Sequence, residues 1–303
     1  MPCWPASCGA VRRSGEALPV IRPELSVLTV SAGRPQLLLT KLAALARQRP
    51  EPDRLELVLV DNACPEGVGD VVERERWPFT VRVVRTARRE GAGRARCLAA
   101  AAATAPLVWL SDDDCLPAPD AAACHLARQR RAAGVVIGAV RFVDGAHART
   151  WRPRRVGPAQ LAGANASLPR EAMLRACDTR LELPRAYGGE DIVLGLQLRD
   201  QGMPFMAAPE AVVDHQGPDP TRGADPSKGF DAGYNAVMIA RRWPAAAWQL
   251  GVHPLQLVLK ALTFRALEAW LREHSAPGRL RYERAYLDGS RRARHTLAQE
   301  GRA

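Results

Sequence analysis

The sequence contains few lysines and no long hydrophobic run. Lys41, Lys228 and Lys260 are its three lysines among 43 basic residues, so the formal charge of +11 comes almost entirely from arginine. Abundant arginine together with alanine is typical of GC-rich coding, and no module that combines basic with aromatic residues is present. Nucleic acid is therefore not predicted as a partner. No stretch of ~18 uninterrupted apolar residues occurs, which excludes a membrane-spanning segment.

Cysteine pairs at metal-binding spacing are also missing. The seven cysteines are odd in number and are never spaced as CxxC, which argues against a disulfide scaffold and against a structural zinc site. We therefore expect reduced cysteines and a cytoplasmic location. Residues 1–23 have no apolar core long enough for a signal peptide and are predicted to form an unstructured leader.

Several catalytic motifs are absent as well. The chain has no GxxxxGK[ST] phosphate loop, no GxSxG and no HExxH. The stretch REGAGRAR fails the dinucleotide-binding pattern, because Arg96 stands where the third glycine belongs. The chemistry must therefore come from other residues.

Alternating apolar runs and helical stretches predict a parallel sheet covered by helices on both faces. The predicted strands are Leu25–Val30, Leu55–Val60, Thr80–Val84, Leu107–Leu110, Val135–Val143 and Ala211–His215. The predicted helices are Pro35–Arg47, Val68–Arg76, Ala92–Ala103, Asp120–Ala132 and Ile192–Gln201, followed by three beyond Pro218 at Phe230–Arg242, Pro254–Glu273 and Gly278–Leu297. We expect one α/β domain over residues 24–218 and a helical region over 219–303. The apolar face around Leu255–Trp270 is predicted to pack as core, with a membrane surface or a partner as the alternatives.

Two acidic elements lie where such a sheet binds ligands, at the carboxyl ends of its strands. Asp112, Asp113 and Asp114 directly follow the run Leu107–Leu110. Adjacent carboxylates repel one another, and a divalent cation such as Mg²⁺ or Mn²⁺ would offset that repulsion and attract a diphosphate. The second element, GGED, ends in Glu190 and Asp191 at the start of a helix, whose positive end stabilises carboxylates.

Taken in order, the motifs resemble glycosyltransferase family 2. They are LSVLTVSAGRP, LVLVDN, GAGRARCLAAAAATAPLVWLSDDDCLP, GANASL, GGEDIVLGLQLRDQG and PEAVVDHQGP, and they cover about Leu25 to Pro218. The resemblance implies a GT-A fold, in which a Rossmann-like, mostly parallel sheet is sandwiched by helices. It also implies a hexosyltransferase-type enzyme that moves a sugar from a nucleoside-diphosphate sugar to an acceptor hydroxyl, as in the synthesis of cell-envelope polysaccharide.

The resemblance also assigns roles to single residues. Asp191 matches the catalytic base, and Glu190 beside it orients the acceptor. Asp61 matches the residue that reads the nucleobase, for which a pyrimidine and hence a UDP-sugar is expected. The metal ligands implied are Asp112, Asp114 and His215. The implied nucleotide-sugar site comprises Ser31, Arg34, Asp61, Gly93, Arg96, Asp112, Asp113, Gly163 and Asn165.

Base and metal on opposite sides of the sugar imply a single displacement, and hence inversion at the anomeric carbon. The chain departs from the family pattern at Ser31-Ala32-Gly33, where Thr-aromatic-Asn is usual, and at Cys97, where Asn is usual. Both departures bear on the identity of the donor. Three alternatives stay open, namely a nucleotidyltransferase acting on sugar phosphates, a catalytically inactive nucleotide-sugar-binding protein, and a module for anionic polymer or lipid. The acceptor expected is a glycan, a lipid-linked molecule or a small molecule, with peripheral contact of the C-terminal helices to the inner face of the membrane.

Overall fold

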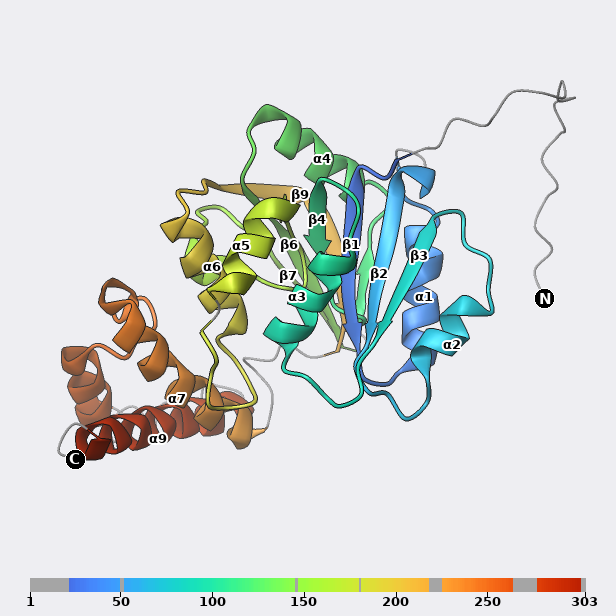
Figure 1. Cartoon of the computed structure of the whole chain (residues 1–303). Coiled ribbons are helices and arrows are strands. Elements are labelled where there is room, and N and C mark those ends of the chain that lie inside the picture. Colours follow the sequence, from blue (N-terminus) through green and yellow to red (C-terminus); the bar gives the residue numbers. More distant parts are fainter. Residues whose placement is uncertain are drawn as a thin grey trace, which may run out of the picture.

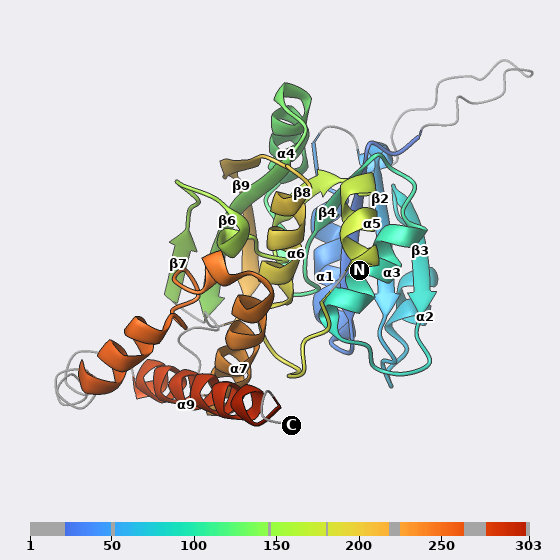
Figure 2. The same ribbon diagram turned by 60° about the vertical axis from the view of Figure 1, so that its left-hand side comes forward.

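The computed structural model describes residues 22–49, 52–144, 147–179, 181–217, 225–263 and 277–300. The predicted leader lies outside these residues apart from Arg22 and Pro23. The described residues form a twisted sheet covered by helices, with further helices near one end of it (Figures 1 and 2).

The strands of the sheet follow the apolar runs of the sequence. They are β1 (Leu25–Ser31), β2 (Leu55–Asp61), β3 (Thr80–Arg85), β4 (Leu107–Leu110), β5 (Cys115–Pro117), β6 (Val135–Asp144), β7 (His147–Trp151), β8 (Ala166–Pro169) and β9 (Phe205–Gln216). Their order is β3-β2-β1-β4-β8-β6-β9-β5, with β7 paired to β6. Pairing from β3 to β4 is parallel, while β8 is antiparallel to both β4 and β6. The predicted mostly parallel sheet is confirmed, with β8 as an unpredicted reversal at its centre.

Helices cover both faces of the sheet. They are α1 (Pro35–Leu45), α2 (Val68–Glu73), α3 (Ala92–Ala102), α4 (Ala121–Arg131), α5 (Arg170–Asp178) and α6 (Glu190–Asp200), with short 3-10 turns at Pro52–Arg54 and Pro158–Gln160. One apolar core lies beneath α3, α5 and α6, and a second lies beneath α1, α2 and α4. All seven residues of β2 are buried, which explains why its central run Leu57–Val60 is apolar without alternation.

The C-terminal helices α7 (Pro226–Arg242) and α9 (Pro277–Glu300) pack closely together, with a 3-10 turn at Pro244–Ala246 and a helix over 254–263 between them. Glycine makes the close crossing of α7 and α9 possible. A Cβ on Gly233 would lie 2.0 Å from the Tyr286 carbonyl oxygen, and one on Gly289 would lie 2.0 Å from that of Phe230. Helix α7 also packs against α6 through Ile239 and Trp243. The predicted helical C-terminal region is therefore present over the described residues.

Two sequence expectations are corrected. Cys97 of α3 and Cys177 of α5 form a disulfide with a Cα–Cα distance of 5.7 Å, so the expectation of reduced cysteines is wrong for this pair. Two cysteines 80 residues apart carry no spacing signal, and packing of α3 against α5 brings them together. The apolar face predicted as core is exposed at Leu255 and Leu262, which are 63% and 70% accessible. The part of that face beyond residue 263 lies outside the described residues.

Candidate active site

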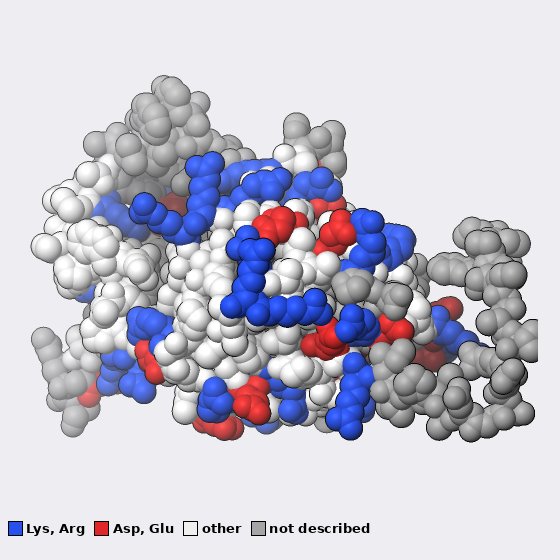
Figure 3. Space-filling model, turned by 90° about the horizontal axis from the view of Figure 1, so that it is seen from above, with Lys and Arg blue, Asp and Glu red and all other residues white. Residues whose placement is uncertain are grey.

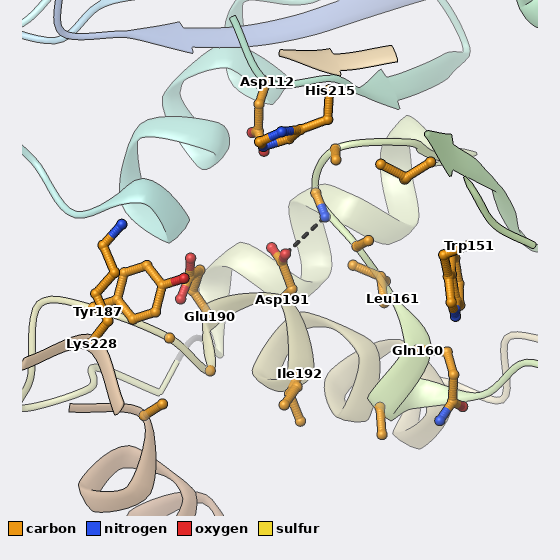
Figure 4. Close-up of a pocket in the computed structure, with 18 of the residues that line it drawn as sticks. Asp112, Trp151, Gln160, Leu161, Tyr187, Glu190, Asp191, Ile192, His215 and Lys228 are labelled. Atoms are coloured by element: carbon orange, nitrogen blue, oxygen red, sulfur yellow. Dashed lines mark hydrogen bonds between the residues drawn. The ribbon is translucent and has the colours of Figure 1, made fainter. Parts of the chain in front are cut away.

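A cleft of about 1070 Å³ lies between the sheet and the C-terminal helices. Its lining includes eight residues predicted for the site, namely Arg34, Arg96, Asp112, Asp114, Gly163, Glu190, Asp191 and His215. In Figure 4, Asp112 and His215 lie on one side of the cleft and Asp191 faces them from the start of α6. The two acidic elements of the sequence therefore meet in one place.

The turn that carries the three aspartates rests on a buried lysine. Lys41 of α1 is fully buried, and its ammonium donates to the Ser111 hydroxyl at 2.6 Å and to the Asp112 carbonyl at 2.8 Å. It also donates to the carbonyl of Ser111. Burial lowers the pKa of Lys41, although the nearby carboxylates oppose this shift. Sequence analysis did not assign this residue. The signal that could have found it is a lysine at an apolar-face position of a predicted helix, in a chain with three lysines.

Arg34 closes the other side of the aspartate turn. Its guanidinium donates to Asp114 at 2.9 Å and to Asp113, and Asp113 also accepts a hydrogen bond from the Ser31 hydroxyl at 2.7 Å. Burial raises the pKa of Asp113 despite these partners. Asp113 is only 3% exposed and does not line the cleft, so the turn presents Asp112 and Asp114 to the cleft and keeps Asp113 beneath them.

Arg96 links the two acidic elements. One guanidinium nitrogen donates to Asp191 at 2.6 Å and the other to Asp112 at 2.9 Å. Burial opposes the charge of Asp112, but Arg96 holds the pKa of Asp112 below its ordinary value. Gly163 leaves the space that this guanidinium occupies, because a Cβ there would lie 2.1 Å from it. The Gly163 N–H donates to the second oxygen of Asp191 at 2.8 Å, shown as the dashed line in Figure 4.

The loop before Asp191 is held by α7. Gly188 and Gly189 have positive φ angles of 82° and 103°, which favour glycine. The fully buried Asn235 donates to the Gly188 carbonyl at 2.7 Å and to the carbonyls of Arg185 and Tyr187. Burial, with the negative charge of Asp191 alongside, raises the pKa of Glu190. Asp191 therefore has a fixed place at the start of α6.

The donor atoms at the aspartate turn suit a hard divalent cation. Asp112, Asp114 and Cys115 offer ligand atoms within 4.8 Å of one another. Burial, together with the Asp112 charge, raises the pKa of the Cys115 thiol well above its ordinary value, which makes this thiol a poor ligand for Mn²⁺ or Mg²⁺. The Nε2 atom of His215 lies 3.7 Å from an Asp114 oxygen and offers a better third ligand.

Other predicted residues lie outside the cleft lining. Both carboxylate oxygens of Asp61 accept backbone hydrogen bonds, from Cys64 at 3.1 Å and Gly69 at 3.0 Å. Asn165 is fully buried and bonds to Trp109, His125 and two carbonyls, so it holds the sheet together rather than facing the cleft. Ser31 supports Asp113, and Gly93 lines a small neighbouring cavity beside Cys97.

The charge distribution bears on the class of partner. On the face drawn in Figure 3, basic side chains are more extensive than acidic ones, and acidic side chains lie beside several of them. The acidic residues gathered in the cleft suit a ligand that arrives with a cation.

The family follows from the sequence match. Residues 26–183 match the model of glycosyl transferase family 2, and they contain the strands that carry Asp61 and the aspartate turn. The chain belongs to glycosyl transferase family 2. It is therefore a glycosyltransferase, and Asp191 and His215 lie beyond the matched segment. A search of curated protein sequences found no significant match.

Solved structures agree on the fold. The mannosyltransferase PcManGT from Pyrobaculum calidifontis, in complex with GDP-Man and Mn²⁺, superimposes with a TM-score of 0.59 at 22% identity, covering 89% of this chain and 86% of that one. Residues 1–349 of S. aureus TarS, in complex with UDP-GlcNAc, give 0.57 at 14% identity, with 91% and 92% covered. GalNAc-T7 with UDP, GalNAc and Mn²⁺ gives 0.55 at 16% identity, with 71% and 51% covered. These likenesses show that this glycosyltransferase has the GT-A fold.

Proposed function

We propose that the enzyme transfers a sugar from a nucleoside-diphosphate sugar to an acceptor hydroxyl, with a divalent metal and with inversion at the anomeric carbon. The observation that carries the proposal is the pairing of Asp112 and Asp191 through Arg96 in one cleft. A strand-end carboxylate suited to a metal thus faces a helix-start carboxylate suited to a base.

Asp112, Asp114 and His215 would hold the metal, since the two carboxylates offer oxygens within 4.8 Å of each other and the His215 Nε2 atom lies 3.7 Å from an Asp114 oxygen. A bound Mn²⁺ or Mg²⁺ supplies electrostatic stabilisation of the negative charge on the departing diphosphate. Arg34 donates to Asp114 and Arg96 donates to Asp112. The two guanidinium groups would therefore be close enough to bind the diphosphate when the metal takes the carboxylates.

Asp191 is the proposed general base. Arg96 and the Gly163 N–H each hold one of its oxygens, which keeps the carboxylate oriented toward the cleft. In the reaction, Asp191 would take the proton of the acceptor hydroxyl while that oxygen bonds to the anomeric carbon and the bond to the diphosphate breaks. General-base catalysis of this kind contributes typically ~10²–10⁴-fold in rate. Glu190, on the same turn, is proposed to orient the acceptor.

The donor is proposed to be a UDP-sugar, with Asp61 near its base. The fold neighbours bind different nucleotides, namely GDP-Man in one and UDP-GlcNAc in another, so nucleobase choice must depend on local residues. Calorimetry with UDP, GDP and dTDP in the presence of Mn²⁺ tests this choice. Equal affinity for the three would exclude a base-reading role for Asp61.

The acceptor side of the cleft is walled by the C-terminal helices. Tyr187, Lys228 and Tyr282 line it, and the Lys228 ammonium lies 5.1 Å from the Tyr187 ring centre. Tyrosine rings and a cation suit a glycan, a lipid-linked molecule or a small molecule, as in cell-envelope polysaccharide synthesis. Among the described residues, no helix is both long and apolar enough to cross a bilayer. A cytoplasmic enzyme with peripheral membrane contact is part of the proposal.

The deciding experiment is a screen of nucleotide sugars for Mn²⁺-dependent release of the nucleoside diphosphate, run beside donor calorimetry. Asp191→Asn should transfer sugar about 10²-fold or more slowly with nearly normal donor affinity, because the amide cannot take the proton. Glu190→Gln should weaken acceptor affinity more than donor affinity. Asp114→Ala should abolish the Mn²⁺ enhancement of nucleoside-diphosphate binding. Near-parental transfer by Asp191→Asn would place the base elsewhere, and full donor affinity in EDTA would exclude the metal role.

A further inference from the structure

A disulfide lies one residue from the arginine that links the two acidic elements of the cleft. Cys97 directly follows Arg96 in α3, and its partner Cys177 lies in the last turn of the neighbouring α5 (Figure 2). Arg96 donates to Asp112 and to Asp191, so its guanidinium contacts both acidic elements. The crosslink therefore ties to α5 the part of α3 that carries this guanidinium.

The start of α3 has little stability of its own. No side chain caps the helix at Gly91, and Gly93 lies in its first turn. Gly91 and Ala92 are exposed. A helix start that lacks a cap and contains glycine is weakly stabilised by its own sequence. The position of Arg96, one turn further on, thus depends on contacts with other elements, and Cys97 supplies a covalent one.

A small cavity lies beside the disulfide, among α3, α5 and the first turns of α6. Its volume is about 30 Å³, and its lining includes Arg96, Cys97, Cys177 and Glu190. Side chains around a void lack the dispersion contacts that close packing would give them, and the void leaves room for α3 to shift. The disulfide therefore restrains α3 at a place where non-covalent packing is incomplete.

The bond is within reach of a thiol reductant, because Cys97 and Cys177 are both only partly buried. A dithiol attacks one sulfur to give a mixed disulfide, and its second thiol then completes the exchange. Two electrons and two protons pass to the protein sulfurs, which become two thiols, while the dithiol becomes a disulfide. In cytoplasmic proteins, the class to which the proposed function assigns this chain, disulfides are commonly transient and redox-sensing.

We propose that the Cys97–Cys177 disulfide is a redox-sensitive restraint on Arg96. The oxidised bond keeps Arg96 between Asp112 and Asp191, and reduction by a dithiol frees the start of α3, so that the guanidinium loses this fixed place. Donor binding and sugar transfer then fall on reduction and return on reoxidation. This consequence for activity rests on the proposed function, whereas the restraint on α3 does not.

Amide hydrogen exchange over minutes tests the restraint on the full chain. Reduction with dithiothreitol should raise exchange at least about tenfold in residues 95–100, while strand β2 stays protected because the chain remains folded. The double variant Cys97→Ser with Cys177→Ser keeps the other five of the seven cysteines and should exchange like the reduced parent with or without dithiothreitol. Cys124→Ser changes a free cysteine of α4 and should respond to reduction like the parent.

Arg96→Lys tests whether the effect on activity passes through Arg96. UDP affinity in the presence of Mn²⁺ is measured by calorimetry, and turnover with a donor is measured beside it. In the parent, reduction should lower both about fivefold or more, because a displaced Arg96 no longer holds the two acidic elements. In Arg96→Lys, which is impaired from the start, reduction should lower them by less than about twofold, because the restrained group is already missing. A bond that only stabilises the fold would add the same loss in both backgrounds.

Unchanged exchange in residues 95–100 on reduction overturns the proposal. Equal losses in the parent and in Arg96→Lys overturn it in favour of a bond that stabilises the fold alone. A response of the double serine variant to dithiothreitol would assign the effect to other cysteines and overturn it as well. Faster exchange at the start of α3, in a chain that neither binds UDP nor releases a nucleoside diphosphate when oxidised, would keep the restraint and refute only the proposed transfer.

Discussion

Lys41 shows how a single buried charge can fix the geometry of a site that it does not line. Its ammonium bonds to Ser111 and to the backbone of Asp112, so it fixes the turn whose carboxylates face the cleft. It is one of three lysines in the chain, and helical spacing alone places it on the buried face of α1. A positive charge at this depth also reduces the repulsion among the three aspartates.

Replacing Lys41 by methionine should destabilise the fold and weaken the donor site together. The change leaves buried oxygens unpaired and removes a cation next to buried carboxylates, so we expect a loss of about 3 kcal/mol in the free energy of unfolding. Urea titration measures this loss, and calorimetry with UDP and Mn²⁺ measures the donor site. Arg47→Met, at an exposed arginine just beyond α1, is the control and should change stability by less than about 0.5 kcal/mol. Equal behaviour of the two variants would refute the supporting role of Lys41.

Gly163 is a second residue whose effect is local. A Cβ at this position would lie 2.1 Å from the Arg96 guanidinium, so Gly163→Ala should displace Arg96 and with it one partner of Asp191. We expect transfer to fall about 10²-fold, because misplacement of a catalytic group by ~1 Å has effects of this size. Turnover of the donor measures it. Gly91→Ala is the matched control, since a Cβ at Gly91 meets nothing within 4 Å, and its turnover should stay near the parental value.

At the scale of elements, α7 positions the catalytic loop from outside the α/β domain. Asn235 bonds to three carbonyls of the segment from Arg185 to Gly188, and Ile239 packs against Leu183 and Val193. The glycines at 188 and 189 need this support, because a loop with two positive φ angles is not held by local preference alone. The C-terminal region is therefore coupled to Asp191.

Asn235→Ala should lower kcat while leaving donor affinity near the parental value. The side chain contacts the loop and not the aspartate turn, so the loss should affect the orientation of Asp191 rather than the donor site. Steady-state kinetics with calorimetry separates these effects. Ser290→Ala is the control, because Ser290 bonds to the Gly233 carbonyl in the same α7–α9 contact without touching the loop. A matching fall in kcat for both variants would reduce Asn235 to a general packing role.

The elements also show what sequence alone can predict. Strands β1 to β4 were predicted with boundaries within one residue, since each is an apolar run ended by polar residues. The short strands β5 and β8 were not, because three or four residues carry little periodic signal and depend on their partners across the sheet. Asn165 was predicted for the donor site from its motif, yet its bonds to Trp109 and His125 form only when distant strands pair.

At the scale of the whole molecule, the disulfide joins two helices on the same face of the sheet. It closes a loop with a sequence separation of 80 residues. By the chain-entropy model, a crosslink of that span stabilises the fold by about 4 kcal/mol. Dithiothreitol should therefore lower the free energy of unfolding of the parental chain by roughly this amount.

The double variant Cys97→Ser with Cys177→Ser should start at the lower stability and show no response to dithiothreitol. Cys64→Ser changes a free cysteine and is the control, expected to respond to reduction like the parent. Urea unfolding with and without the reductant measures all three. Identical parental stability in both conditions would mean that the bond contributes nothing measurable to the fold.

Acid stability should depend on the buried network that joins α4 to the sheet. His125 is fully buried, with Nε2 2.8 Å from the Asn165 side-chain oxygen and Nδ1 2.9 Å from the Ser167 hydroxyl, and burial lowers the pKa of His125 to about 4. In the unfolded chain the pKa of a histidine is ~6.5, so the unfolded chain binds a proton more readily than the folded one does. The contribution of neutral His125 to the free energy of unfolding is therefore complete above pH ~6.5 and is lost as the pH falls toward about 4. The loss reaches about 3 kcal/mol over that window. Urea unfolding at pH 7.5, 6 and 5 gives the free energy of unfolding as a function of pH. Its slope with pH should be flatter in His125→Gln than in the parent, whereas His295→Gln should keep the parental slope. Parallel pH profiles for the parent and His125→Gln would exclude the histidine as the cause.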